Sequence, residues 1–245
     1  MEISLAAEDI FYIGFFPVTN SLLLTWIAMC ILVIFGAFSA YKLQTVPGRL
    51  QNVAEFVIEK MYDFTKNIIG TDRNTEKVFP FIVTFFIFIL ISNWLGLVPG
   101  VGTIGINVEK DHSEHFFPFL RAPAADLNTT LAFAIISVII TNIFGISAIG
   151  FSKHVGKFIS FKNPIAFFVG ILETIAEVAK ILSFSFRLFG NVFAGEVLLI
   201  VIATLVPYIA PVPFLALEIF VGFIQALVFT MLTLVFIKVA IEEHH

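Results

Sequence analysis

One basic side chain stands alone in an apolar run in the C-terminal third of the sequence. Within KILSFSFRLFGNVFAGE, residues 180–196, Arg187 has no basic neighbour closer than Lys180. An arginine near the middle of a bilayer costs about 3 kcal/mol on insertion scales and roughly 10 or more in simulations of isolated helices. Its guanidinium stays protonated at every pH that a cell reaches, so it attracts a carboxylate but cannot pass a proton on. This chemistry is that of a gate rather than of a proton relay.

Helical geometry gives this run two different faces. At about 100° per residue, Ser183, Arg187 and Asn191 share one stripe. Glu196 follows nine residues after Arg187 and falls on the opposite side. One face therefore carries a fixed cation with hydroxyl and amide neighbours, and the other carries an ionisable carboxyl group. The alternative is that Arg187 pairs with a carboxylate of the same chain and only holds helices together.

The composition indicates a polytopic membrane protein. The chain has 245 residues, 59% of them hydrophobic and 13% charged, with a mean hydropathy of +1.00. A net charge of -4 gives no reason to expect nucleic acid as a partner. The single cysteine, Cys30, can form no internal disulfide. Residues 2–16 contain acidic residues and no basic region, so we expect no signal peptide.

We predict an all-α membrane protein that forms a single membrane domain over residues 1–245. It has about five membrane helices and one interfacial amphipathic helix, in which apolar residues recur at steps of three and four. A helix packed on a neighbouring subunit is a compatible interpretation of that segment. The expected membrane helices cover 18–41, 78–98, 127–150, 165–206 and 213–241, and the interfacial helix covers 50–69.

The last two membrane helices are expected to be long and tilted. No proline lies between Pro164 and Pro207, and a helix over those 42 residues is about 63 Å long, roughly twice the hydrocarbon thickness. A mismatch of this size requires a steep tilt or a partly interfacial course. The proline-rich segment 207–213 predicts a reversal into a hairpin. Glu218 and Gln225 are seven residues apart, so they share a face that can turn toward the first arm.

The segment 99–126 is the longest expected irregular stretch, and it carries most of the polar loop residues. His112 and His115 have the spacing of metal ligands, but without a third ligand nearby a solvated loop is the favoured interpretation. Asp126 and Asn128 stand where the next helix begins. They are either an ordinary helix cap or the first polar groups that an incoming ion meets.

The distribution of basic residues predicts the orientation in the membrane. Segments 42–77 and 153–162 together with Lys238 hold ten Lys and Arg residues, whereas the loops of the other side hold two, Lys110 and Arg121. By the positive-inside rule the N-terminus is outside and the C-terminus is cytoplasmic.

Four runs in the right order resemble subunit a of the F-type ATP synthases. They are SFRLFGN followed by AGE, PAADLNTTLA, PGRLQNVAE, and the C-terminal IQALVFTMLTLVFI, and the resemblance covers nearly the whole chain. In that family the subunit is a membrane stator beside a rotating ring of c subunits, and two half-channels lead ions to and from the ring carboxylates. The resemblance therefore implies the c ring, the b subunits of the peripheral stalk and the lipid bilayer as partners. It implies a transported proton, with sodium as the alternative, and no cofactor, metal or nucleic acid.

The same resemblance assigns roles to individual residues. Arg187 resembles the essential arginine that separates the half-channels. The other matching positions are Asn191 and Gln225 near that arginine, Glu196 and Glu218 in the outer half-channel, Glu173, Lys180 and Ser183 on the cytoplasmic route, and Asp126 and Asn128 at the entrance of the third span.

Two other functions are compatible with intramembrane ionisable groups. In a secondary transporter, Arg187 would bind an anionic substrate while Glu196 or Glu218 coupled protons, but the sequence has no internal repeats of the kind that build such proteins. A membrane scaffold would leave those ionisable residues without a use. We expect a subunit that is no enzyme by itself, in a bacterial plasma membrane.

Overall fold

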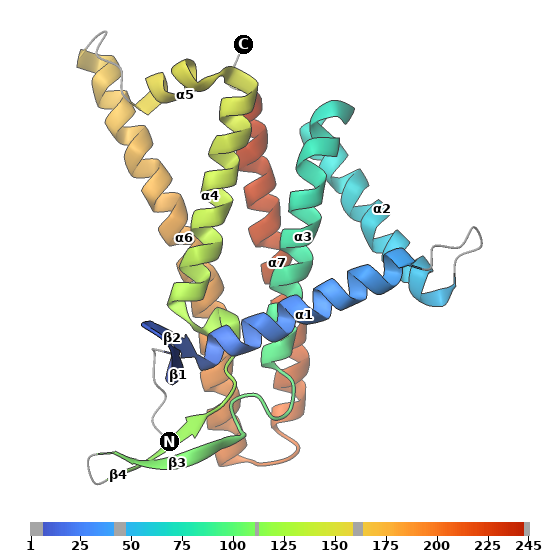
Figure 1. The fold of residues 1–245 in the computed structure, drawn as a ribbon, viewed down its shortest axis with the longest axis vertical. Coiled ribbons are helices and arrows are strands. Elements are labelled where there is room, and N and C mark those ends of the chain that lie inside the picture. The colour runs from blue at the N-terminus through green and yellow to red at the C-terminus, as the bar shows by residue number, and fades with distance from the viewer. Residues whose placement is uncertain (1–6, 42–47, 111–112, 159–163, 243–245) are drawn as a thin grey trace.

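The computed structural model describes residues 7–41, 48–110, 113–158 and 164–242. Within these ranges the chain forms seven α-helices, one short 3-10 helix and two β-hairpins (Figure 1). The helices are α1 (Asn20–Tyr41), α2 (Arg49–Ile69), α3 (Asp72–Gly96), η1 (Pro123–Ala125), α4 (Leu127–Ile149), α5 (Phe151–Phe158), α6 (Pro164–Leu205) and α7 (Pro211–Glu242).

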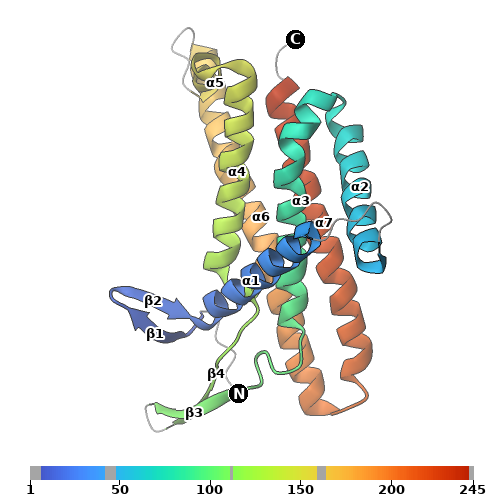
Figure 2. The ribbon, with the colours of Figure 1, turned by 45° about the vertical axis from the view of Figure 1, so that its right-hand side comes forward.

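Five of these helices are long and apolar enough to cross a membrane, namely α1, α3, α4, α6 and α7. A stretch of about 20 apolar residues spans the hydrocarbon of a bilayer, because a helix rises about 1.5 Å per residue. The prediction of an all-α membrane protein is therefore confirmed. The interfacial position expected for residues 50–69 stays a prediction, and the helix α2 over that segment runs beside α3 (Figure 2).

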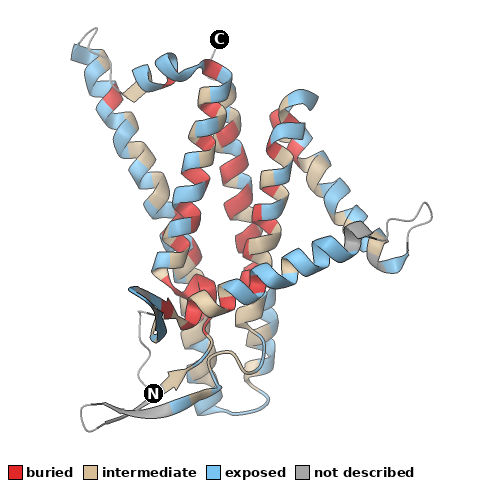
Figure 3. Ribbon diagram, in the orientation of Figure 1, coloured by how far each residue is buried: buried red, intermediate tan, exposed pale blue. Residues whose placement is uncertain are grey.

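Helices α3, α4 and α7 run side by side, and α6 slants across them to meet α7 in an antiparallel hairpin (Figure 1). The hairpin turns at Pro207, and the next residue, Tyr208, has a left-handed backbone with φ of 80°. The expected long hairpin is thus present, and its tilt in the membrane stays a prediction. Helix α1 crosses the bundle obliquely and leaves most of its surface exposed (Figure 3).

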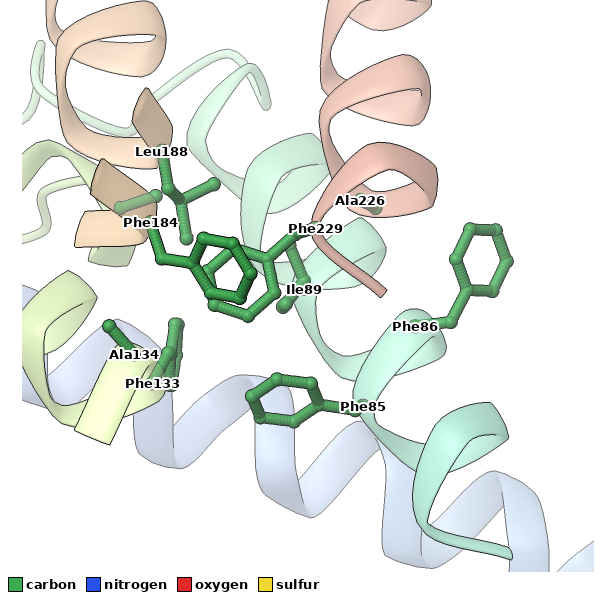
Figure 4. Packing of buried hydrophobic residues seen from close by; sticks show 10 residues of the cluster. Phe85, Phe86, Ile89, Phe133, Ala134, Phe184, Leu188, Ala226 and Phe229 are labelled. Carbon is green, nitrogen blue, oxygen red and sulfur yellow. The ribbon is translucent and has the colours of Figure 1, made fainter. Parts of the chain in front are cut away.

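Aromatic side chains fill the interior where α3, α4, α6 and α7 meet (Figure 4). Phe229 is almost fully buried, and its ring centroid lies 5.4 Å from that of Phe85 and 4.9 Å from that of Phe184. Lipid tails are as apolar as these rings, so close packing and interhelical hydrogen bonds associate the helices. One such bond joins Ser137 of α4 to Thr233 of α7, with 2.7 Å between their hydroxyl oxygens.

Three short elements differ from the sequence expectation. A hairpin of β1 (Asp9–Ile13) and β2 (Phe16–Thr19) precedes α1, and β3 (Gly105–Lys110) pairs with β4 (Ser113–Pro118) inside the segment expected to be irregular. The short helix α5 occupies most of the basic loop. Each of these elements depends on pairing or docking with another segment, which the hydropathy of a single stretch does not report.

Candidate functional site

Arg187 lies on the exposed side of α6, about midway along the helix. Its Nη2 donates a hydrogen bond of 3.3 Å to Ser183 Oγ, and its guanidinium carbon lies 5.8 Å from the centroid of the Phe184 ring. Among the residues that the structure describes, no carboxylate lies within ion-pair distance of Arg187. The alternative in which a carboxylate of this chain neutralises Arg187 therefore has no support in the described part of the chain.

A cavity of about 360 Å³ opens beyond Arg187, toward the α6–α7 turn. Asn191, one turn after Arg187, is part of its wall, so the stripe that begins with Ser183 leads toward this space. The end of α3 and the loop after it close the other side. The polar side chains of the lining are those of Asn93, Thr103, Asn191, Glu196 and Glu218.

Glu196, which lines this cavity, is paired with a buried cation that is not part of the lining. Its Oε2 lies 3.6 Å from Nε of Arg121, whose side chain is only 6% exposed. Arg121 belongs to the buried segment that leads into η1 and α4, so the ion pair ties this segment to α6. From the sequence, Arg121 was identified only as a basic loop residue. Its position two residues before the family-like run PAADLNTTLA was the available signal.

Glu218 reaches the same cavity from α7 by lying against the backbone of α6. A Cβ on Gly195 would overlap the Glu218 carboxyl group, so with any larger residue at 195 this carboxyl group would have to move. Gly195 precedes Glu196, and the two carboxylates therefore meet at one level of the hairpin. Gly195 was not among the predicted site residues, because its contact with Glu218 forms only in the folded bundle.

Helix α3 holds α7 at this level through two side chains. Asn93 Nδ2 donates to the carbonyl of Gly222 at 3.1 Å, and Trp94 Nε1 donates to the carbonyl of Ile219, also at 3.1 Å. Asn93 is buried, and its Oδ1 at the cavity wall accepts no hydrogen bond from the described residues. This oxygen is an acceptor that a water molecule in the cavity can use.

Gln225 is buried on α7, and its Nε2 makes no hydrogen bond within the described ranges. It does not line the cavity, although it lies seven residues after Glu218. The structure therefore brings Asn191, Glu196 and Glu218 together around one space and leaves Gln225 deeper in the bundle.

Asp126 acts as the N-cap of α4. Its Oδ1 accepts from the backbone N–H of Asn128 at 3.2 Å, and its Oδ2 accepts from Ser21 Oγ at 3.0 Å and from Thr129 Oγ1 at 3.1 Å. These bonds cap the helix and attach it to α1. Asn128 is exposed, and neither residue lines the cavity.

The polar residues near the other end of α6 form a separate cluster. Lys180 Nζ lies 2.7 Å from Glu177 Oε1 and 4.8 Å from the centroid of the Phe236 ring on α7. Glu173 lies one turn before Glu177 and is partly exposed, as is Lys180, while Ser183 is exposed beside Arg187. In the described residues no group of three or more His, Cys, Asp or Glu side chains could hold a metal ion.

Comparisons with known proteins agree on one family. The family model described as ATP synthase A chain matches residues 22–238. The "ATP synthase subunit a 3" of Pelobacter propionicus is 34% identical over 223 residues, which cover 90% of this chain and 87% of that protein. The "ATP synthase subunit a" of Geotalea uraniireducens is 35% identical with the same coverage, and that of Syntrophobacter fumaroxidans is 37% identical over 227 residues, 90% of this chain and 84% of that protein.

Proposed function

The chain belongs to the ATP synthase A chain family, and from this premise we propose that it moves ions through two offset half-channels to and from the carboxylates of a rotating c ring. Membership of the family makes it a non-catalytic subunit of the membrane sector with a role in ion translocation. Its five apolar helices make it a multi-pass membrane protein. The ring, the half-channels and the assignment of residues to them are the proposal.

The exposed guanidinium of Arg187 is the observation that carries this proposal. A permanent charge on an apolar helix surface is costly in a bilayer unless an opposite charge meets it. No carboxylate of the described residues does so. A carboxylate of another subunit, held at the same depth, would satisfy both the charge and the geometry. Each ring carboxylate that passes Arg187 is then drawn into its ionised form and must release its ion.

The cavity beside Glu196 and Glu218 is the outer half-channel in this proposal. It holds two carboxyl groups and two asparagines that can bind water and exchange protons. Asn191 lies both in this cavity and one turn from Arg187, so it marks the inner limit of the outer path. Asp126, Asn128 and Gln225 remain proposed members of this path, the first two at its entrance and the third beside its end.

The inner half-channel follows the first half of α6, from Glu173 past Lys180 to Ser183. These residues recur at steps of three and seven along the helix and end one turn before Arg187. The basic segments 42–77 and 153–162 support a cytoplasmic position for this end and an outside position for the N-terminus, by the positive-inside rule. Arg187 then separates two aqueous paths that open on opposite sides.

Protons are the proposed ion, with sodium as the alternative, in a bacterial plasma membrane. Each charge that crosses 100 mV releases about 2.3 kcal/mol, which successive ring steps accumulate for ATP synthesis elsewhere in the complex. The exposed surface of α1 and the amphipathic helix α2 are available to lipid and to the b subunits of the peripheral stalk.

Removal of the arginine in the assembled complex tests the proposal. In membrane vesicles, Arg187→Ala should lower potential-driven ATP synthesis by at least about a hundredfold, equivalent to ~2.7 kcal/mol of barrier, while passive proton leak persists or rises. Lys238→Ala is the matched control, because it removes a positive charge from a partly exposed pair with Glu242 at the end of α7. Coupled synthesis that survives Arg187→Ala in a fully assembled complex would disprove the role of the arginine.

A further inference from the structure

The short helix α5 contains one buried residue in a basic segment that is otherwise exposed or half-buried. His154 is only 5% exposed, whereas Lys153 and Val155 beside it point outward. A buried histidine in a connecting segment needs a partner for its ring nitrogens, since an unsatisfied polar group in the interior is costly. Helix α5 lies at the same end of the bundle as the C-terminus (Figure 1).

The partner of His154 is Asn142 of α4, and the bond fixes the tautomer of the ring. His154 Nε2 lies 2.8 Å from Asn142 Oδ1. The amide nitrogen of Asn142 is already committed, because it donates to the carbonyl of Val138 at 2.9 Å. The oxygen therefore faces the histidine, and Nε2 must carry the proton of a neutral ring. Nδ1 is then an acceptor, and it makes no hydrogen bond in the described part of the chain.

The ring lies directly on the backbone of α4 at a glycine. A Cβ on Gly145 would come within 2.9 Å of His154 Cε1 and 3.1 Å of Nδ1. On its other side the ring packs against Phe158, with 5.6 Å between centroids. A proton added at Nδ1 would meet glycine backbone and no acceptor from the described residues, so the charged form fits this site poorly.

The far end of α5 docks on α6 at a second glycine. A Cβ on Gly170 would overlap the carbonyl of Phe158, so the two backbones are in close contact. This contact brings Lys157 next to the inner cluster, where it is attracted by Glu173 and Glu177 and repelled by Lys180. Partial burial lowers the pKa of Lys157, and the attraction of Glu173 opposes that shift. Helix α5 is thus held between α4 and α6 with its lysine at the proposed inner path.

We propose that His154 is a positioning residue. In its neutral Nε2–H form it holds α5 between α4 and α6 and keeps Lys157 beside Glu173 and Glu177. Acid at this end of the molecule therefore releases α5 and slows ion translocation. The link to translocation rests on the proposed function, whereas the attachment of α5 does not. His154 does not line the large cavity, so it touches no ion on the outer path.

The charged groups around His154 favour the neutral ring at ordinary pH. Burial lowers the pKa of His154, the charge of Lys157 on the same helix lowers it further, and Glu177 of α6 opposes these effects. Helix α4 contains no ionisable side chain, and on α7 Lys238 pairs with Glu242 at 3.6 Å. Because the folded-state pKa lies below the ordinary value of about 6.5, the attachment is complete above pH 6.5 and is lost as the pH falls below it toward the folded-state pKa.

Hydrogen exchange of the α5 amides in the assembled complex tests the attachment without any transport. With the pH of the α5 side varied from 8 to 5.5, exchange corrected for its intrinsic pH dependence should rise below pH 6.5. One coupled proton allows at most about a tenfold rise per pH unit. In His154→Gln a side-chain N–H still reaches Asn142 but does not titrate, so exchange should not change with pH. Lys153→Gln, an exposed change on the same helix, should respond as the original chain does.

ATP-driven proton pumping by the same complexes in inverted vesicles tests the consequence. Pumping by the original chain should slow over the pH window in which α5 loosens, and His154→Gln should pump at the original rate at pH 8 and lose the additional acid sensitivity. The proposal would be overturned if the original chain and His154→Gln responded to acid in the same way, or if α5 exchange in the original chain did not change with pH. If α5 exchange follows pH as expected but the original complex translocates no ions at pH 8, the proposed function fails and the attachment of α5 is supported.

Discussion

The two arms of the hairpin, α6 and α7, are almost equally apolar, yet they bury very different shares of their residues inside the chain. In the most apolar stretch of α7, 39% of the residues are buried inside the chain, compared with 11% for α6. Helix α7 turns its hydroxyls inward, so that Thr233 bonds to Ser137 and Thr230 is buried. Helix α6 keeps Ser183 and Arg187 on its open side.

This difference separates polar groups that serve the fold from polar groups that serve a partner. A polar residue in an apolar helix must be satisfied, and on α7 the Thr233 hydroxyl bonds both to Ser137 of α4 and to the carbonyl of Phe229 within the bundle. The permanent charge of Arg187 is satisfied by no carboxylate in the described residues. Changes on the open side of α6 should therefore alter function and spare stability, and changes on the covered side of α7 should do the reverse.

The largest effect is expected from Arg187→Lys. The ammonium retains a positive charge but lacks the planar fork, and it can lose its proton when it is desolvated. We expect ATP synthesis to fall by about a hundredfold or more, with assembly and thermal stability of the complex unchanged. Rates of ATP synthesis and unfolding midpoints, measured on the same preparations, check the expected loss of synthesis and the expected unchanged stability. A loss of stability large enough to account for the loss of synthesis would contradict the distinction between the open side of α6 and the covered side of α7.

An intermediate effect is expected from Gly195→Ala, where the two arms touch. The added methyl group would overlap the Glu218 carboxyl group and displace it from the level of Glu196. Displacement of a reacting group by about 1 Å is enough to slow a step by tenfold or more. Proton pumping in vesicles measures the effect. Gly36→Ala on α1 is the control, because a Cβ there meets nothing within 4 Å, and equal losses in both variants would contradict the role of Gly195.

The smallest effect is expected from Thr233→Val on the covered side of α7. It removes the 2.7 Å bond to Ser137, and interhelical bonds in membranes contribute about 0.6 kcal/mol on average. Unfolding of the complex in denaturing detergent should show this loss while synthesis is retained. Thr204→Val makes the same chemical change on α6, where Thr204 is exposed and bonds only its own helix. If Thr204→Val lowered the stability of the complex as much as Thr233→Val does, burial would not distinguish the two arms.

Hydropathy was sufficient to predict the membrane helices, because a helix that satisfies its own backbone can be recognised from one segment. Arg187 could be found in the same way, as a charge where charges are costly. The pairs Arg121–Glu196 and Gly195–Glu218 could not, since each joins segments that only the folded bundle brings together. Residue type alone favoured the helix cap for Asp126 and the family resemblance favoured the ion path equally, and the structure adds the capping bonds and the bond to Ser21.

The bonds from Asn93 and Trp94 to α7 have a mechanical consequence under the proposed function. In that proposal a ring rotating past α6 would push the stator sideways, and the push would reach α7 where Glu218 lies against Gly195. The carbonyls of Ile219 and Gly222, within one turn of Glu218, are the two that α3 holds. Load applied at the proposed ion path would therefore pass to α3 close to Glu218, and the two bonds would help the carboxylates to keep their spacing under torque.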